Sequence, residues 1–253
     1  MDGSYATKGL TQRTWPDFVR LFSQGGGWDF CACMLFQRGC QPIGKQYRGR
    51  AATHAKNLAD KEDLVRDGQA HGILVYADDE PVGWCEYGPI AELPLPGAKR
   101  LESKVERASP ISEWRIPCFV THKNYRRRGV AGVALAAAVE AIGRQGGGWV
   151  EATPIVGSHP AGRYHQIVRA HGRDSDQMQE FLANWPYHDV PGVGPVPLTR
   201  GGFGGVSHPG TVSMFLRQDF EPVKIIRDTC VLMQRHVSNR TRGGVLEPSW
   251  CQS

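Results

Sequence analysis

The sequence predicts a mixed α/β (α+β) fold in which a single domain spans residues 1–253. Residues 114–153 read in the order strand, loop, helix, strand, which predicts a βαβ-type crossover. Two apolar runs at 73–77 and 82–87 flank a turn of acidic residues and predict a hairpin. With 40% hydrophobic residues, a chain of this length can bury one substantial core.

The first elements are two helices. Thr14 precedes the run WPDFVRLF, where it can act as N-cap with a proline in the first turn, so a helix is expected there. A second helical stretch covers 51–67, and its spacing predicts that Ala55, Leu58 and Leu64 face the core. A cysteine-bearing loop joins the two helices.

After the hairpin, residues 89–110 combine prolines with charges of both signs, which favours an exposed connection. A strand is expected at 114–120. The next segment has apolar residues at helical spacing, so a helix with a face of small side chains should pack close to a sheet; these residues are Val130, Val133, Ala134, Ala137, Ala138 and Ala141. Glycines at 146–148 end it, and a strand follows at 149–153.

Residues 157–210 are rich in Gly, Pro and His and contain one convincing helical stretch, at 175–185, so they are interpreted as an insertion over the core. A short helix at 211–217 and strands at 220–227 and 229–235 complete the domain. The tail at 238–253 is expected to be loose.

Composition excludes several classes of protein. No run approaches the ~18 apolar residues of a membrane helix, and the first ten residues lack the pattern of a secretion signal. A cytoplasmic protein without a membrane partner is therefore expected. The seven cysteines are read as reduced thiols, and the set Cys31, Cys33 and Cys40 lacks the second half of a zinc motif, so no metal site is predicted.

The densest positive charge, Arg126–Arg128, stands where a strand turns into a helix. Such a junction offers unpaired backbone N–H groups at the positive end of the helix dipole, and Gly129 and Ala131 leave that backbone bare. A diphosphate is the natural occupant. Neither the nucleoside-triphosphate loop nor the dinucleotide loop motif is present, and the absence of aromatic residues among the arginines argues against nucleic acid.

The strand CFV followed by THKNYRRRGVAGVALAAAVEAIGRQGGGWVEATP resembles the acetyl-CoA signature of the GNAT superfamily of N-acetyltransferases. In its pattern, Q/R-x-x-G-x-G/A, the three defined positions are filled by Arg126, Gly129 and Ala131. The resemblance is strongest over 114–154. It extends more weakly to about four fifths of the chain, leaving out the insertion and the tail.

The resemblance implies the GNAT fold, a mixed central sheet flanked by helices and splayed at the cofactor cleft, with acetyl-CoA as acyl donor. The pantetheine arm would lie between the strands that end at Val120 and near Thr153, with Phe119 and Val120 beside it. The diphosphate would be bound by Arg126, Arg127, Arg128, Gly129, Val130 and Ala131. Pro117 cannot donate a ladder hydrogen bond, so a bulge or splay is expected there.

Acetyl transfer to an amine requires a group that takes the amine's proton. Glu113 is the first candidate for this base, with Glu151 and Glu86 as further choices; each could equally be a polar surface residue. The family's usual Tyr acid is replaced by Phe215 in TVSMFLRQDF. Ser213, Tyr164, Tyr187, or no acid at all remain open.

The function implied is transfer of an acetyl group to the primary amine of a small molecule, by direct attack in a ternary complex, with the insertion forming part of the acceptor site. A protein or peptide amine as acceptor, and a CoA-binding or sensing module without catalysis, stay open as alternatives. Homodimer formation also stays open.

Overall fold

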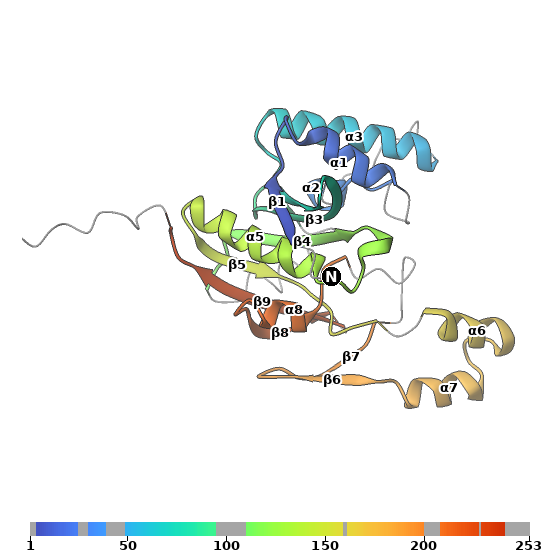
Figure 1. The fold of residues 1–253 in the computed structure, drawn as a ribbon. Helices are drawn as coiled ribbons and strands as arrows, with labels where there is room; N and C mark the ends of the chain where they lie inside the picture. Colours follow the sequence, from blue (N-terminus) through green and yellow to red (C-terminus); the bar gives the residue numbers. More distant parts are fainter. Residues whose placement is uncertain are drawn as a thin grey trace, which may run out of the picture.

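A computed structural model describes residues 4–24, 30–38, 49–94, 110–158, 161–199, 208–227 and 229–240. The described chain is built on a seven-stranded sheet of order β1-β2-β3-β4-β5-β9-β8 (Figure 1). Among the described strands of this sheet, only β4 and β5 pair in parallel. The strands are β1 (Tyr5–Gly9), β2 (Gly72–Ala77), β3 (Glu80–Pro89), β4 (Trp114–Thr121), β5 (Gly148–Ala152), β8 (Glu221–Arg227) and β9 (Cys230–Val237). This arrangement confirms the mixed sheet.

Helices cover both faces of the sheet (Figure 1). One core cluster joins the sheet to α5 and α8, and the other joins it to α1 and the segment around α2. The helices are α1 (Trp15–Ser23), α2 (Met34–Arg38), α3 (Arg50–Arg66), α5 (Val130–Arg144), α6 (Ala161–His171), α7 (Asp176–Ala183) and α8 (Val212–Leu216), with a 3-10 turn, η2 (Lys123–Tyr125).

The predicted hairpin and crossover are confirmed. Strands β2 and β3 pair antiparallel across a turn in which Asp78 takes a positive φ of 53°, and almost every residue of both strands is buried. Helix α5 connects the parallel strands β4 and β5, and its buried face includes Ala134, Ala138 and Ala141. Small side chains let this helix lie close to the sheet.

The sheet opens in its middle. Strands β4 and β5 pair only at Trp114 with Val150 and at Arg115 with Glu151, and beyond these positions the two strands have no ladder between them. Next to this opening, the register between β3 and β4 shifts, so that residues 116 and 117 of β4 lie opposite residue 87 alone. This is a β-bulge, and it accommodates the proline that cannot donate to the ladder.

The predicted inward face of α3 is right only for Leu58, which packs against the core. Ala55 is exposed and Leu58 and Leu64 are only half-buried, whereas Asn57, Lys61 and Val65 face the core. The Asn57 side chain donates to the backbone oxygen of Phe30 at 2.7 Å, and Lys61 is bound by several acceptors. Polar groups can be buried when they have such partners, and hydrophobic spacing does not reveal the partners.

Two other expectations also need correction. Strand β3 reaches Pro89 and Leu93 is buried, so the start of the 89–110 connection belongs to the core; residues 95–109 lie outside the described residues. The 157–210 segment holds two helices, α6 and α7, and a hairpin of β6 (Tyr187–Val190) and β7 (Gly194–Pro197), instead of one helix.

Strand β1 and helix α2 were not predicted. Cys40 and residues 241–253, most of the expected loose tail, lie outside the part of the chain that the structure describes.

Candidate active site

The loop between β4 and α5 exposes its three arginines and Gly129 to solvent. Arg127 and Gly129 both take left-handed backbone conformations, with φ of 60° and 83°. A Cβ at Gly129 would meet no atom within 4 Å, so the space before the helix is open. The N–H of Val133 bonds to the oxygen of Gly129 at 3.1 Å, which leaves the N–H groups of 130–132 outside the helix's own ladder.

Packing on the neighbouring strand holds this loop in place. Val130, the first residue of α5, is buried, and its Cγ1 would lie 2.3 Å from a Cβ at Gly83 of β3. The helix can therefore begin here only because β3 carries no side chain at that point. The N-terminal end of α5 is thereby fixed at the mouth of the β4–β5 opening.

The splayed edge of β4 presents the N–H of Phe119. That group donates to the backbone oxygen of His208 at 2.6 Å. Val120 lies opposite Trp84 of β3, and because strand N–H groups alternate between the two edges, its N–H points to β3 instead. Phe119 and Val120 were both expected beside the acyl donor, and Phe119 is the one whose N–H faces the opening.

The segment at 208–212 lies between the two halves of the sheet. Beyond the Phe119 bond, the N–H of Ile155 donates to Gly210 at 3.2 Å and the N–H of Val212 donates back to Ile155 at 2.9 Å. The end of the insertion therefore bridges β4 and the chain beyond β5. No sequence pattern indicated this contact.

The carboxylates named from the sequence lie at the other end of the strands. Glu113 is exposed just before β4, and its carboxylate accepts from the N–H of Trp149. Glu151 is buried, and one of its oxygens accepts from Nε and Nη2 of Arg115 at 2.8 and 2.7 Å. Burial raises the pKa of Glu151, although the Arg115 guanidinium opposes that rise.

Of the residues considered as acids, Ser213 lies on α8, whereas Tyr164 lies on α6 and Tyr187 on β6, both within the insertion. Ser213 is exposed and its hydroxyl is 3.2 Å from that of Thr211. Phe215 is fully buried, with its ring edge-on to Phe119 and Phe220. It belongs to the core and offers no proton.

The structure brings the arginine loop, the Phe119 N–H and Ser213 to the carboxyl ends of β4 and β5. Glu113 lies at the opposite end of β4, roughly 25 Å along an eight-residue strand from the loop. Glu151 sits at the last paired position before the opening. The predicted cofactor residues thus cluster, whereas the two predicted bases lie apart from them.

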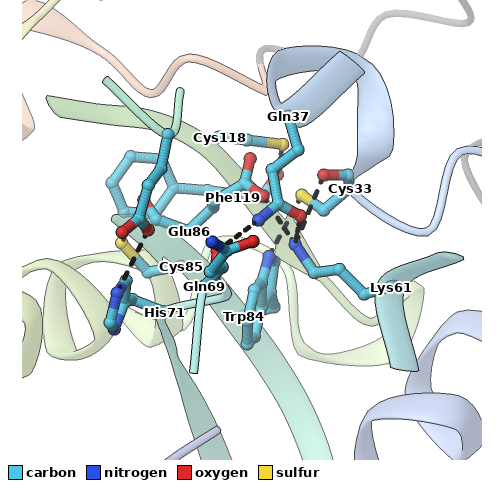
Figure 2. A network of polar contacts seen from close by, with 11 residues as sticks. Cys33, Gln37, Lys61, Gln69, His71, Trp84, Cys85, Glu86, Cys118 and Phe119 are labelled. Carbon is cyan, nitrogen blue, oxygen red and sulfur yellow. Dashed lines mark hydrogen bonds and ion pairs between the residues drawn. The ribbon is translucent and has the colours of Figure 1, made fainter. Parts of the chain in front are cut away.

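Sequence reasoning missed a buried ion pair between Lys61 of α3 and Glu86 of β3 (Figure 2). Glu86 was named only as a further choice, and Lys61 was not named. A signal was present: Asn57, Lys61 and Val65 share one helix face at intervals of four, and the run VGWCEY holds a single charge among buried positions.

Within the described residues, no helix is both long and apolar enough to cross a membrane. No curated protein matches the chain. Three similar solved structures are a ribosomal-protein-alanine N-acetyltransferase from Brucella melitensis biovar Abortus 2308, an aminoglycoside acetyltransferase from an uncultured soil metagenomic sample in complex with sisomicin, and the histone acetyltransferase HPA2 and related acetyltransferase from Corynebacterium glutamicum ATCC 13032.

The Brucella protein is 14% identical over 55% of this chain and 72% of its own, with a TM-score of 0.31. The aminoglycoside enzyme is 11% identical over 54% and 68%, with a TM-score of 0.30. The Corynebacterium protein is 13% identical over 91% and 95%, with a TM-score of 0.42.

The model of the Acetyltransferase (GNAT) family matches residues 36–167, more than half of the chain. That match includes β2 to β5, the arginine loop and α5. The chain belongs to the GNAT family of N-acetyltransferases.

Proposed function

We propose that this acetyltransferase carries the acetyl group of acetyl-CoA to a primary amine of a small molecule, by direct attack of the amine in a ternary complex. The observation that carries this proposal is the arginine loop. It joins three exposed arginines, bare backbone at Gly129 and free helix N–H groups at the mouth of an opened sheet.

The loop suits a diphosphate for electrostatic and steric reasons. Arginine side chains and helix N–H groups bind phosphate oxygens well, and a backbone without a Cβ lets them approach. We assign this role to Arg126, Arg127, Arg128, Gly129, Val130 and Ala131. Acetyl-CoA would supply the activated acyl group, held as a thioester.

The Phe119 N–H is the proposed donor to the thioester carbonyl. It faces the opening, and a fixed N–H aimed at a carbonyl stabilises the charge that develops when an amine attacks. In the free protein this N–H is bound by the oxygen of His208. The sequence named Glu113, Glu151 and Ser213 as proton-transfer groups; of these we retain Ser213 here, because its placement beyond β5 favours contact with the leaving thiolate.

The insertion at 157–210 is the proposed acceptor-binding element. It leaves the chain after β5 and returns immediately before α8, so both of its ends lie at the opening of the sheet. Elements added to a shared core at such a point commonly determine the substrate.

A non-catalytic CoA-binding role is the competing proposal, because Phe215 replaces the Tyr that the family commonly uses as acid and is buried among aromatic rings. The two proposals differ in turnover alone. Binding of acetyl-CoA without transfer to kanamycin, spermidine or tyramine would favour the competing role.

The first test is calorimetric titration of the purified chain with acetyl-CoA, using Gly129→Gln. The added side chain would enter the space proposed for the diphosphate, so we expect a loss of affinity of at least about 30-fold, that is about 2 kcal/mol. Gly68→Gln is the matched control, because Gly68 also has a left-handed φ, of 73°, with no atom within 4 Å of its Cβ position.

Both variants carry the same kind of backbone strain, about 1 to 3 kcal/mol. If Gly68→Gln weakened binding as much as Gly129→Gln, strain would explain the loss and the loop would not be the donor site. Equal affinity in all three proteins would contradict the placement directly.

A further inference from the structure

A buried polar cluster lies on β3, between the sheet and helices α2 and α3 (Figure 2). Lys61 is 0% exposed and Glu86 is 1% exposed. The Lys61 ammonium donates to Oε1 of Glu86 at 2.8 Å and to Oε1 of Gln37 at 2.6 Å, with the oxygen of Cys33 at 3.5 Å. The lysine thereby uses its three protons.

The second oxygen of Glu86 has no such partner. Oε2 is buried and makes no hydrogen bond within the described part of the chain. A buried acceptor left without a donor is costly, and such atoms in folded proteins indicate a water, an ion or a ligand that belongs there. An anionic oxygen calls for a donor with positive charge or several protons, which an ammonium group provides.

The surroundings of Glu86 are held with strain. Ala32 and Cys33 both take left-handed conformations, with φ of 43° and 49°, a state that costs free energy for residues with a Cβ. This turn places the Cys33 sulfur 3.1 Å from Nε1 of Trp84, beside the ion pair. Strained backbone of this kind is found more often at functional sites than elsewhere.

Glu86 also lies close to the opening of the sheet. It stands opposite Cys118 of β4, one residue before Phe119, and both lie immediately beyond the bulge. A single strand, about 4.8 Å wide, separates Glu86 from the splayed edge. The Glu86 carboxylate and the Phe119 N–H therefore belong to neighbouring strands, one residue apart in register.

We propose that Glu86 is the catalytic residue that binds the acceptor's ammonium group and takes its proton, and that Lys61 is a positioning residue that holds the carboxylate in place. This inference rests on the proposed function. It assigns Glu113 and Glu151 other roles: Glu113 holds the Trp149 N–H, and Glu151 with Arg115 clamps the last paired position of β4 and β5.

The step balances as follows. The ammonium gives one proton to Oε2, and the neutral amine attacks the thioester carbon, forming the C–N bond as the C–S bond breaks. The second amine proton goes to the thiolate, and Glu86 later releases its proton to solvent. Burial raises the pKa of Glu86, against the effect of Lys61, so the carboxylate is a stronger base than an exposed glutamate.

The other titratable groups that face Glu86 are thiols. Cys31 and Cys33 come from the turn before α2, Cys118 from β4, and Cys85 from β3 itself. The pKa of each thiol is raised above its ordinary value: burial is the main cause for Cys31, Cys33 and Cys85, and in Cys118 a hydrogen bond with Cys33 lowers the pKa but burial and nearby acidic groups together outweigh it. Lys61 is the one charged group packed against the carboxylate among the described residues. The acidic limb of the pH profile should therefore report Glu86.

The test uses Glu86→Gln and the double variant Lys61→Met/Glu86→Gln. The single change leaves a buried ammonium unpaired and is expected to lower the melting temperature, whereas the double change removes both charges and should fold normally. Asp60→Asn is the matched control, since it makes the same carboxylate-to-amide change on α3 outside the cluster.

We expect the double variant to bind acetyl-CoA like the wild type, to lose between about 100-fold and 10,000-fold in kcat with kanamycin, spermidine or tyramine, and to lose the acidic limb of kcat/KM. Asp60→Asn should change neither. A folded double variant that retains turnover within about 3-fold and the same pH profile would overturn the proposal and make the ion pair structural.

A second readout separates this inference from the proposed function. The wild-type carboxyl resonance of Glu86, labelled with ¹³C and assigned by its absence in Glu86→Gln, is followed while spermidine is added. If no amine is acetylated but this resonance still shifts, the amine-binding site at Glu86 is supported and the proposed acetyl transfer is contradicted. If no amine is acetylated and the resonance does not shift, both the amine-binding site and the proposed acetyl transfer are contradicted.

Discussion

A single missing side chain decides where the proposed donor site lies. At Gly83 a Cβ would come within 2.3 Å of Val130 Cγ1 and 3.2 Å of Val75 Cβ, so β3 and the first residue of α5 touch through bare backbone. The arginine loop ends at that contact. The position of its N–H groups is therefore coupled to one residue of β3, a strand that also holds the start of the loop through the hydrogen bond from the His122 N–H to the oxygen of Val82.

Gly83→Ala should push the first turn of α5 away from β3. We expect a loss of about 1 to 3 kcal/mol in the free energy of unfolding, which is typical of overpacking, and several-fold weaker binding of acetyl-CoA. Urea denaturation and calorimetry measure the two effects. Gly9→Ala on β1, where a Cβ meets nothing within 4 Å, should alter neither; equal effects from both would disprove the coupling.

The buried carboxylate of Glu86 predicts the sign of one pH dependence. Burial raises the pKa of this carboxyl above its ordinary value of 4.5. Between the pKa of the unfolded state and the higher pKa of the native state, the native state therefore binds more protons than the unfolded state. Stability from this group is then present at low pH and decreases as pH rises, by up to about 1.4 kcal/mol per pH unit.

Other groups titrate in the same range, so the comparison is with Lys61→Met/Glu86→Gln. Urea denaturation from pH 4.5 to 7.5 should show the wild type losing stability relative to this variant as pH increases. A difference that is flat, or that grows in favour of the wild type, would mean that the Glu86 pKa is not raised in the fold.

At the level of elements, the sequence predicted the helices and strands whose buried residues recur at a regular local spacing. Strands β2 and β3 are apolar runs around an acidic turn, and α5 repeats small residues at helical spacing. The bulge followed from Pro117 alone. Each of these signals lies within a few residues of the structure that it predicts.

Elements that depend on distant partners escaped prediction. β1 is an edge strand, four of whose five residues are exposed, so it shows no alternation. The face of α3 was misassigned apart from Leu58, because the burial of Lys61 depends on distant acceptors, among them Glu86, 25 residues away. The candidate site divides in the same way: the arginine loop is local, while the Lys61–Glu86 pair and the Phe119–His208 contact join separate parts of the chain.

The segment at 208–210 should compete with the acyl donor, because its carbonyl already occupies the Phe119 N–H. Gly210 has a φ of 78°, and a Cβ there would lie 3.1 Å from Phe215 and 3.2 Å from Phe119. Gly210→Ala should therefore loosen the segment, speed amide hydrogen exchange at Phe119 by at least about 10-fold, and strengthen acetyl-CoA binding.

Gly194→Ala, with a φ of 93° and open space around its Cβ position, controls for strain. Calorimetry measures the affinity for acetyl-CoA, and NMR measures the rate of amide hydrogen exchange at Phe119. Weaker binding in Gly210→Ala, with faster exchange at Phe119, would show that the segment supports the site instead of obstructing it.

The molecule as a whole is two half-sheets held at a narrow junction. Strands β1 to β4 form one half and β5, β9 and β8 the other, and they share only two paired positions. Helix α5 and the Arg115–Glu151 ion pair span the junction. An opening of this kind gives a cofactor access to strand backbone in the middle of the sheet, away from its outer edge strands β1 and β8.

The insertion is attached to this frame at a point where its ends meet. The N–H of Thr199 donates to the oxygen of Gly157 at 3.0 Å, and its hydroxyl lies 3.1 Å from that of Ser158. In Figure 1, α6, α7, β6 and β7 extend from one side of the sheet. A three-residue linker can therefore replace residues 159–198 without pulling the frame apart.

We expect that replacement by Gly-Ser-Gly leaves a protein that unfolds cooperatively, because all seven strands of the large sheet and α5 lie outside the excised part. Val190 and Val196 belong to the core, so stability should fall by about 3 to 6 kcal/mol. Acetyl-CoA affinity should stay within about 3-fold, since the arginine loop is untouched, while transfer to the amine should be lost.

Thermal unfolding, calorimetry and turnover with the best amine test these three expectations separately. An unchanged KM for the amine would remove the insertion from the acceptor site. A loss of cooperative unfolding would show instead that the insertion is part of what folds the domain, because the two buried valines that it contributes to the main core are too few to account for it. If acetyl-CoA still binds but no acetyl group is transferred, recognition of acetyl-CoA lies in the large sheet and α5, and recognition of the amine lies in the insertion.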